Sequence, residues 1–373
     1  MIIPLSISNP FILNIMYKKT LLIALTWLAV AFGSSSNAVQ AQSRWTEAQA
    51  NAWYAKLPWL SGCDYIPATA INQIEMWSKK TYDPRQIDKE LGWAEGLGFN
   101  TMRVFLSSVV YQHDPDGLKA RMNDFLSICQ RHGIKPLFVF FDDCWNAESA
   151  YGKQPAPKTG IHNSGWVRDP SVSLRGDTVK LYAALSKYVT DIISTFAQDD
   201  RILLWDLYNE PGNSKHGVSS LPLLRKVFEW ARSARPSQPL TSGVWKWSKE
   251  FAPLNALQLN ESDVISYHDY GTPEHHANTI RYLQMLNRPL VCTEYMARTK
   301  GSLFKDIMPL LKDNKVVAIN WGFVAGKTNT MYAWDTPMPD GKEPKVWFHD
   351  IYRTDGTPYS QEEIDLIKRL HGK

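Results

Sequence analysis

Short apolar runs alternate with amphipathic segments along most of the chain. Eight of these runs are rich in β-branched or aromatic residues, which is typical of buried strands. They span residues 60–65, 101–106, 135–141, 202–208, 240–244, 264–267, 290–293 and 316–320. Helical signals lie between them, so the pattern predicts repeated β-α units around a parallel sheet.

Capping residues mark the ends of several predicted helices. Asp83 and Thr272 each precede a proline and predict helix starts, and Gly98 predicts a helix end. The last helix begins at Ser360, and Glu363 stands where a capping box needs a glutamate. Eight strands, each followed by a helix, fit into about 330 residues and predict an α/β fold with a single (β/α)8 TIM barrel.

Residues 1–41 have the features of a signal peptide. Lys18 and Lys19 precede twelve apolar or small residues, 21–32, and residues 39–41 give a cleavage pattern. Twelve residues are too few to span a bilayer, and no later apolar run is long enough. We therefore predict one domain over residues 42–373, exported to the periplasm or secreted, with no membrane span. An uncleaved membrane anchor is the alternative.

Charge and cysteine content exclude several classes of partner. The net charge of +4 on 373 residues is too small and dispersed to indicate a nucleic-acid partner. The four cysteines lack the paired spacing of a zinc site, so we expect mostly buried thiols, with a Cys63–Cys144 disulfide as the alternative. His275 and His276 point apart on a helix and are expected at a solvated helix start.

No metal or cofactor is predicted. The oligomeric state stays open, and a monomer is compatible with the sequence.

Polar, aromatic and acidic residues follow nearly every predicted strand. In a TIM barrel these positions form the active-site face. Glu210 and Glu294 each end a buried strand, where a carboxylate is costly unless it faces a polar cavity or forms a salt bridge. The two glutamates together therefore indicate a site with paired carboxylates, whereas either alone could be a salt-bridged structural residue.

Residues 205–211, which end in Asn-Glu-Pro, resemble the fourth-strand motif of clan A glycoside hydrolases, most nearly the cellulase-like glycoside hydrolase family 5. The resemblance extends over essentially the whole mature chain and includes Arg103, Asn209, Glu210, His268, Asp269, Tyr270, Glu294 and Trp321. It implies a retaining β-glycosidase that acts by double displacement on β-linked glucan, mannan or xylan, or on oligosaccharides cut from them. Glu210 is the implied acid/base and Glu294 the implied nucleophile.

The resemblance also implies roles for the residues near the glutamates. Asn209 is similar to the family's ligand for the sugar 2-hydroxyl, and a turn-stabilising Asn is the alternative. Tyr270 is similar to the tyrosine that bonds the nucleophile, and His268 lines the same subsite, unless both are core residues. Trp321 resembles the indole on which the sugar rests. We predict as substrate-binding residues Arg103, Asp142, Asp143, Trp145, Asn209, His268, Tyr270 and Trp321. Arg103 is also expected to keep the nucleophile charged.

The third strand departs from the family pattern. Many family members carry a histidine at its end, whereas this chain has Asp142 and Asp143, which could bind sugar hydroxyls. Alternatively, Asp143 caps a helix or pairs with an arginine. Aromatic residues make up 12% of the chain, and further candidates for sugar platforms are Trp145, Trp166, Trp245, Trp247 and Trp334.

Endo and exo action depend on whether the loops at residues 146–176 and 322–347 close one end of the cleft. We expect a blocked cleft and short substrates, because no separate carbohydrate-binding module fits in the chain. Two other functions stay open at this point. They are a catalytically silent carbohydrate-binding barrel and a transglycosylase that uses the same glutamates.

Overall fold

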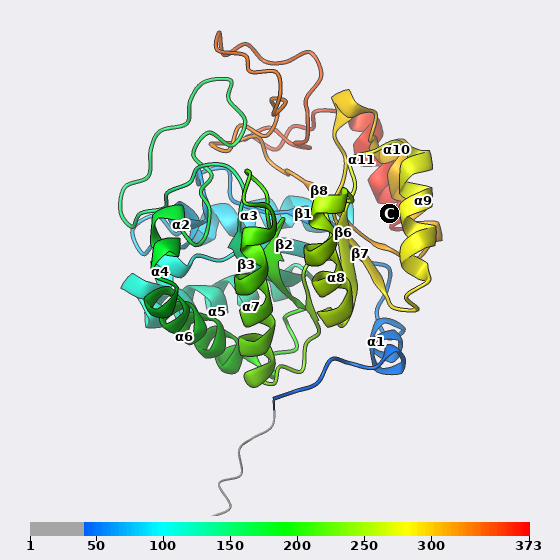
Figure 1. Cartoon of the computed structure of the whole chain (residues 1–373). Coiled ribbons are helices and arrows are strands. Elements are labelled where there is room, and N and C mark those ends of the chain that lie inside the picture. Colours follow the sequence, from blue (N-terminus) through cyan, green and yellow to red (C-terminus); the bar gives the residue numbers. More distant parts are fainter. Residues whose placement is uncertain (1–40) are drawn as a thin grey trace, which may run out of the picture. The chain divides into compact units, whose positions relative to one another are not determined.

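Eight parallel strands form the centre of the computed structural model, which describes residues 41–373 (Figure 1). Each strand coincides with a predicted run to within three residues at either end. The strands are β1 (Ser61–Asp64), β2 (Thr101–Phe105), β3 (Lys135–Asp142), β4 (Trp205–Asn209), β5 (Leu240–Thr241), β6 (Ile265–His268), β7 (Leu290–Glu294) and β8 (Val317–Trp321). The predicted signal peptide lies outside the described residues except for Ala41.

The strand order shows a barrel that is nearly closed. Neighbouring strands pair in the order β5-β4-β3-β2-β1-β8-β7-β6, and all the pairs are parallel. An isolated parallel bridge between Val244 and Tyr267 joins the segments that follow β5 and form β6. The predicted (β/α)8 architecture is therefore confirmed, and its active-site face is the end at which the strands finish.

A helix follows each strand and packs on the outside of the barrel. These helices are α3 (Pro84–Leu97), α5 (Pro115–Arg131), α6 (Thr178–Phe196), α7 (Leu221–Ser233), α8 (Ala252–Glu261), α9 (Pro273–Gln284), α10 (Phe304–Asp313) and α11 (Gln361–Leu370). The shorter helices are α1 (Glu47–Tyr54), α2 (Gln73–Trp77) and α4 (Ser108–His113). Single 3-10 turns are η1 (Val172–Gly176), η2 (Gly217–Ser220), η3 (Lys249–Phe251) and η4 (Arg298–Lys300). None of the helices within residues 41–373 has the length and apolar character needed to cross a membrane.

The predicted helix ends form with one exception. Asp83 accepts hydrogen bonds from the first turn of α3, and Gly98 ends that helix with a left-handed φ of 94°. Ser360 caps α11 by accepting from the Glu363 amide. The Glu363 carboxylate pairs instead with Arg298, so only half of the predicted capping box forms.

The chain before β1 fills the amino-terminal end of the barrel. Thr46 and Gln49 form a reciprocal capping box that starts α1. Partly buried residues of this segment, among them Trp45 and Trp53, pack on the apolar layer at the strand starts. That layer contains Leu60, Leu137, Leu203, Leu204, Val264, Val291, Val317 and Ile319. A ligand site in the barrel therefore has to open at the opposite end.

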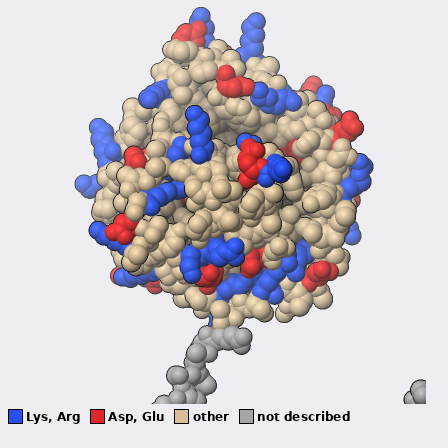
Figure 2. Space-filling model, viewed as in Figure 1, with Lys and Arg blue, Asp and Glu red and all other residues tan. Residues whose placement is uncertain are grey.

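Two sequence-based expectations about side chains have different outcomes. All four cysteines are buried free thiols, so the alternative of a Cys63–Cys144 disulfide is wrong. His275 is exposed at the start of α9, but His276 is completely buried against Asp269, so the expected solvated pair is wrong for His276. Lys, Arg, Asp and Glu side chains intermingle on the face shown in Figure 2 and form no patch of a single sign there.

Two long connections rise from the carboxyl end of the barrel. Residues 143–177 join β3 to α6, and residues 322–360 join β8 to α11. In Figure 1 they are the green and orange loops in the upper part of the view. The connections after β4, β5 and β6 are much shorter, which leaves the mouth of the barrel bordered unequally on its two sides.

Candidate active site

A cavity of about 850 Å³ opens at the carboxyl end of the barrel. Most of the predicted site residues line it, namely Asp142, Trp145, Asn209, Glu210, His268, Tyr270, Glu294 and Trp321. The other four candidate platforms, Trp166, Trp245, Trp247 and Trp334, also line it. Arg103 and Asp143 do not. The predicted positions at the strand ends therefore converge on one pocket, with two exceptions.

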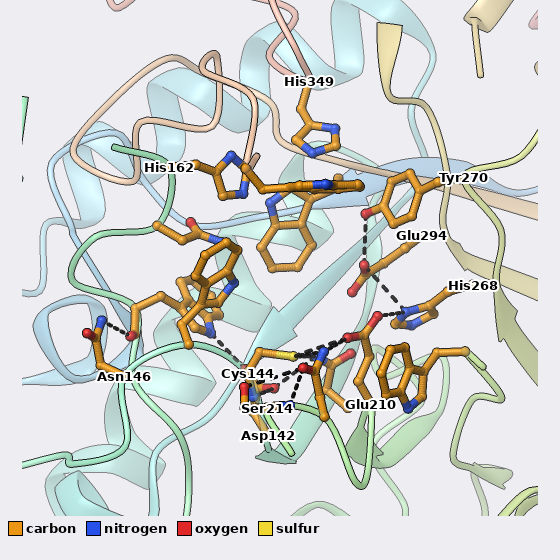
Figure 3. A pocket seen from close by; sticks show the side chains of 18 of the residues that line it. Asp142, Cys144, Asn146, His162, Glu210, Ser214, His268, Tyr270, Glu294 and His349 are labelled. Carbon is orange, nitrogen blue, oxygen red and sulfur yellow. Dashed lines mark hydrogen bonds and ion pairs between the residues drawn. The ribbon is translucent and has the colours of Figure 1, made fainter. Parts of the chain in front are cut away.

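The parallel register brings the two glutamates together. His268 at the end of β6 pairs with Glu294 at the end of β7, and Glu210 directly follows β4 across the barrel. One carboxylate oxygen of each glutamate and one His268 ring nitrogen lie within 4.8 Å of one another. Figure 3 shows the three side chains converging in the pocket. Glu210 has a positive φ of 42°, a conformation that is uncommon for a residue with a side chain and concentrates at functional sites.

Three neighbours contact the Glu294 carboxylate. Arg103 Nη1 lies 3.1 Å from Oε1, and the Tyr270 hydroxyl donates to Oε2 over 2.8 Å. His268 Nδ1 lies 3.4 Å from the same oxygen. Burial raises the pKa of Glu294 and the charge of Glu210 adds to this, while the three neighbours act in the opposite direction. These contacts favour the ionised form of Glu294 over that of Glu210.

The Glu210 carboxylate has no arginine or lysine nitrogen within 4.0 Å among residues 41–373. His268 Nδ1 lies 2.8 Å from Oε1, and burial lowers the pKa of His268 to about 4, so the ring is neutral and donates from Nδ1. The Cys144 thiol donates to Oε2 over 3.3 Å, and the Asn213 amide also donates to this oxygen. Burial raises the pKa of Glu210 above its ordinary value despite these donors.

Arg103 lies beneath the pocket rather than in its lining. It is 1% exposed, and its guanidinium donates to Asp64 (2.8 Å), Asp206 (2.9 Å), Asn209 (2.7 Å) and Glu294 (3.1 Å). All its donors are taken within the protein, so these contacts do not support the prediction that Arg103 binds substrate. They place its positive charge beside Glu294, where the sequence-based prediction expected a charge partner.

Asp142 orients two residues of the pocket. Its Oδ1 accepts from Asn209 Nδ2 over 2.9 Å, and its Oδ2 accepts from Trp166 Nε1 over 2.7 Å. Arg103 holds the oxygen end of the same Asn209 amide. Burial raises the pKa of Asp142 to about 6. Asn209 is thus fixed from both ends, in the place expected for contact with a sugar hydroxyl.

Asp143 is completely buried and points away from the pocket. It accepts from Arg175 (2.5 Å), the Tyr208 hydroxyl (2.9 Å), the Gly212 amide (2.8 Å) and the Ser220 hydroxyl (2.5 Å). These contacts use the acceptor capacity of both oxygens. These contacts do not support the prediction that Asp143 binds sugar, and they agree with the alternative of pairing with an arginine.

Aromatic rings form the floor and sides of the pocket. Trp321 lies edge-on to Trp166 and Phe105, at centroid distances of 5.5 and 5.8 Å. Trp145 and Trp247 are 37% and 40% exposed and therefore stand at the rim. Flat rings around a polar centre suit the apolar faces of sugars.

The strand-end pattern did not reveal several residues that line the pocket. They are Cys144, His162, Asn163, Asn213 and His349. Three of them lie well inside the two long connections, and the only sequence signal for them is loop length. Cys144 directly follows Asp143, and Asn213 stands three residues after Glu210, so closeness in sequence to a strand-end acid is the signal for both.

The same three groups, Glu210, His268 and Glu294, form the one cluster within residues 41–373 whose spacing would suit a metal ion. The Arg103 guanidinium already places a positive charge 3.1 Å from Glu294. An arginine and one shared proton can therefore balance the charge of the two carboxylates. In that state one carboxyl can donate a proton and the other can act as a nucleophile.

Comparison with known proteins agrees with this geometry. The family model described as Cellulase (glycosyl hydrolase family 5) matches residues 67–327. No curated protein was found to match the sequence.

Among solved structures, the chain is similar to the endo-1,4-β-D-mannanase of Thermotoga petrophila RKU-1, with a TM-score of 0.55, 15% identity and coverage of 84% of this chain and 99% of that one. It is also similar to the exo-β-1,4-mannosidase Op5Man5 of Opitutaceae bacterium strain TAV5 (TM-score 0.58, 15% identity, 84% and 59% coverage). A variant GH5_18 protein from Streptomyces cattleya in complex with Manβ1-4GlcNAc has a TM-score of 0.59 at 12% identity, with 84% and 79% coverage. At these identities the likeness supports the fold alone. The family match, which covers most of the chain, shows that this protein is a glycosidase and belongs to glycosyl hydrolase family 5.

Proposed function

We propose that the protein hydrolyses β-glycosidic bonds with retention of the anomeric configuration. The observation that carries this proposal is the separation of the two carboxylates, whose nearest oxygens lie within 4.8 Å. Retaining glycosidases hold their carboxyl groups about 5–5.5 Å apart, whereas inverting enzymes need about 6.5–9.5 Å to admit a water molecule. The short separation supports a direct attack by one glutamate.

In the first step, Glu294 attacks the anomeric carbon while Glu210 gives its proton to the leaving oxygen. The products of this step are a glycosyl ester on Glu294 and the free aglycone. Ester formation removes the negative charge of Glu294, so the pKa of Glu210 falls and its carboxylate can accept a proton from water. That water releases the sugar and restores Glu294.

Before substrate binds, the proton shared by Glu210 and Glu294 is on Glu210. Burial raises the pKa of both carboxyls, so the pair binds a proton more readily than two exposed glutamates would. Arg103 and the Tyr270 hydroxyl favour the ionised form of Glu294, whereas Glu210 has only neutral donors. This asymmetry supports Glu294 as the nucleophile.

We further propose β-mannosides as the first substrates to test among the glucans, mannans and xylans. Support comes from the endo-1,4-β-D-mannanase and the exo-β-1,4-mannosidase that share this fold. The proposal also includes export by residues 1–41, so that the enzyme meets its substrate outside the cytoplasm.

A trapping experiment tests the mechanism. The mature protein is incubated with 2,4-dinitrophenyl 2-deoxy-2-fluoro β-glycosides of mannose, glucose, xylose and galactose, and then analysed by intact mass and peptide mapping. We expect one sugar to give a stable adduct on Glu294, and no adduct with Glu294→Gln. Glu210→Ala should still be labelled, because dinitrophenolate leaves without a proton, but its adduct should turn over more slowly. An adduct on another residue, or hydrolysis with inversion as seen by NMR, would contradict the proposal.

A further inference from the structure

The two long connections are joined by hydrogen bonds above the pocket. We call residues 158–163 and 328–349 the wall. The bonds between its two parts are Met338 N to Gly160 O (3.0 Å), Asn163 N to Thr328 O (2.8 Å), His162 Nδ1 to Tyr332 O (2.8 Å), and Asn329 Nδ2 to Lys158 O (2.9 Å) and Ile161 O (3.2 Å). Mutual bonding of this kind favours a fixed structure over two independent flaps.

The interior of the wall is packed like a core. His162 and Asn163 are 3% and 1% exposed, and Phe348 and His349 are completely buried. The Trp334 ring lies 4.5 Å from Phe348 and nearly perpendicular to it. A loop pair with this burial keeps its shape when substrate arrives.

The wall closes one side of the barrel mouth. In the strand order, β1 and β2 lie between β3 and β8, from which the two parts of the wall arise. Their meeting therefore covers the ends of β1 and β2. On the other side only residues 210–216, 242–248 and 269–272 follow β4, β5 and β6, and the half-exposed Trp247 stands there. The pocket is thus open next to β4 and β5, whereas Tyr270 after β6 lies near Trp334 and His349 of the wall.

The positions of the two glutamates determine which part of the substrate lies next to the wall. Glu210 protonates the leaving oxygen, so the aglycone lies on the open side next to β4. The sugar that becomes attached to Glu294 lies toward Tyr270 and Trp321. The Tyr270 hydroxyl contacts Glu294, and its ring lies 5.0 Å from Trp334 and 5.7 Å from His349.

One aromatic ring therefore separates the nucleophile from the wall. In Figure 3, His162 and His349 lie on the side of the pocket opposite Glu210. The wall therefore lies next to the place of the sugar that becomes attached to Glu294.

Polar groups of the wall that line the pocket have unused hydrogen-bonding capacity. His349 Nδ1 donates to the Met296 carbonyl over 2.7 Å, which leaves its buried Nε2 as an acceptor without a partner among residues 41–373. The Asn163 amide is buried, and neither its nitrogen nor its oxygen has a partner in this part of the chain. Burial lowers the pKa of His162 to about 4, so this ring is also a neutral acceptor. Sugar hydroxyls are the natural partners for such groups.

We infer that the wall ends the pocket behind a single sugar, so that the enzyme removes one sugar at a time from the non-reducing end of its substrate, with Asn163 and His349 contacting that terminal sugar. This inference rests on the proposed function, and it adds which end of the substrate is cleaved and how many sugars are released in each reaction. An open cleft would allow internal cleavage with the same two glutamates.

Product analysis with pentaoses tests the inference. Mannopentaose, cellopentaose and xylopentaose carrying ¹⁸O at the reducing end are each incubated with the wild-type protein, and early products are read by mass spectrometry. We expect unlabelled monosaccharide and labelled tetraose. Unlabelled disaccharide or trisaccharide among the first products would overturn the inference and leave the proposed function intact. If no pentaose and no aryl β-glycoside is cleaved, the proposed function itself fails.

A pair of glycine variants tests the wall directly. Gly160 has a φ of 66°, and a Cβ on it would lie 1.7 Å from the Met338 carbonyl oxygen, so Gly160→Ala has to part the two loops. Gly152→Ala is the matched control, because Gly152 lies in the same connection with a φ of 116° and a Cβ there meets nothing within 4 Å. We expect Gly160→Ala alone to release disaccharide or trisaccharide. A Gly160→Ala protein that folds and still releases only monosaccharide would contradict the role of the wall.

Asn163→Ala gives a second measurement that does not depend on opening the wall. Loss of a hydrogen bond to the terminal sugar should raise the inhibition constant of the free monosaccharide about tenfold. The products should stay the same, because the backbone bond from Asn163 to Thr328 remains. An unchanged inhibition constant would remove Asn163 from the sugar contact.

Discussion

The Cys144 thiol occupies an unusual position next to Glu210, the proposed acid/base. It accepts hydrogen bonds from the amides of Asn209 (3.5 Å) and Asn213 (3.4 Å), which directs its own proton toward Glu210 Oε2 at 3.3 Å. Burial raises the pKa of the thiol, so it remains protonated and can act only as a weak donor to the carboxylate. Its effect is to stabilise the ionised form of Glu210.

Cys144→Ala therefore should shift the pH profile of kcat/KM. The proposed first step needs Glu210 protonated, so we expect activity to fall as the pH rises through its pKa. Removing a donor to the carboxylate raises that pKa, and we expect the basic limb to move up by about half a pH unit, which corresponds to less than 1 kcal/mol. Cys129→Ala, which removes a buried thiol in the core away from the pocket, is the control and should leave the limb in place. An unmoved limb in Cys144→Ala would mean that the thiol has no influence on the acid/base.

At the residue scale, the sequence located the chemistry but not every role. Glu210 and Glu294 could be found because a carboxylate at the end of a buried strand is costly without a purpose. Arg103 and Asp143 look the same in the sequence as pocket residues. Whether such a side chain faces the pocket or the packing beneath it depends on partners far along the chain, such as Asp206 for Arg103 and Arg175 for Asp143.

At the scale of elements, Asp143 joins the end of β3 to the turn that carries Glu210. Its carboxylate binds the amide of Gly212, the hydroxyl of Ser220 and the guanidinium of Arg175. Gly212 and Ser220 belong to the connection between Glu210 and α7, and Arg175 belongs to η1. One buried acid thus fixes three elements around the pocket.

Asp143→Ala should lower the free energy of unfolding by about 3–5 kcal/mol, because it leaves Arg175 half-buried without a counter-charge. Asp177→Ala, which removes only the cap of α6, should cost about 1 kcal/mol and serves as the comparison. Urea unfolding followed by tryptophan fluorescence measures both values. Equal losses in the two variants would show that Asp143 does not join these elements.

The strands could be predicted from sequence because each is a short apolar run between helix signals. The observed strand ends differ from the predicted ends where backbone or side-chain groups make other contacts. β4 begins at Trp205 rather than at residue 202, although the Leu203 amide still donates to the Pro136 carbonyl over 2.8 Å. β5 stops at Thr241, because the Ser242 hydroxyl donates to the carbonyl of Tyr208. Such side-chain contacts leave no periodic signal.

At the scale of the whole molecule, the wall is the feature that could not be predicted from the sequence. Loop length indicated that residues 146–176 and 322–347 matter, and a blocked cleft was expected. The pairing of Gly160 with Met338, and of Asn163 with Thr328, depends on how two loops separated by almost half the chain meet in space. The family resemblance covers the strand ends and leaves these loops undetermined.

The buried acid Asp350 makes the stability of the whole fold depend on pH. It lies directly after His349, and its two carboxyl oxygens lie 2.8 and 2.9 Å from the Thr330 hydroxyl. Burial raises its pKa from 3.8 to about 7. The folded state thus binds this proton more tightly than the unfolded state, so the stability that Asp350 contributes is complete below pH 4 and is lost as the pH rises to about 7.

Asp350→Asn cannot titrate and should escape this loss. Between pH 4 and pH 8, its free energy of unfolding should gain about 4 kcal/mol on that of the wild type, the value of a pKa difference of about three units. Urea unfolding at both pH values measures the change. Asp340→Asn, an exposed change in the same connection, is the control and should follow the wild type. If Asp350→Asn also follows the wild type, Asp350 is ionised in the folded protein at neutral pH, and the packing around Thr330 has to stabilise a buried negative charge.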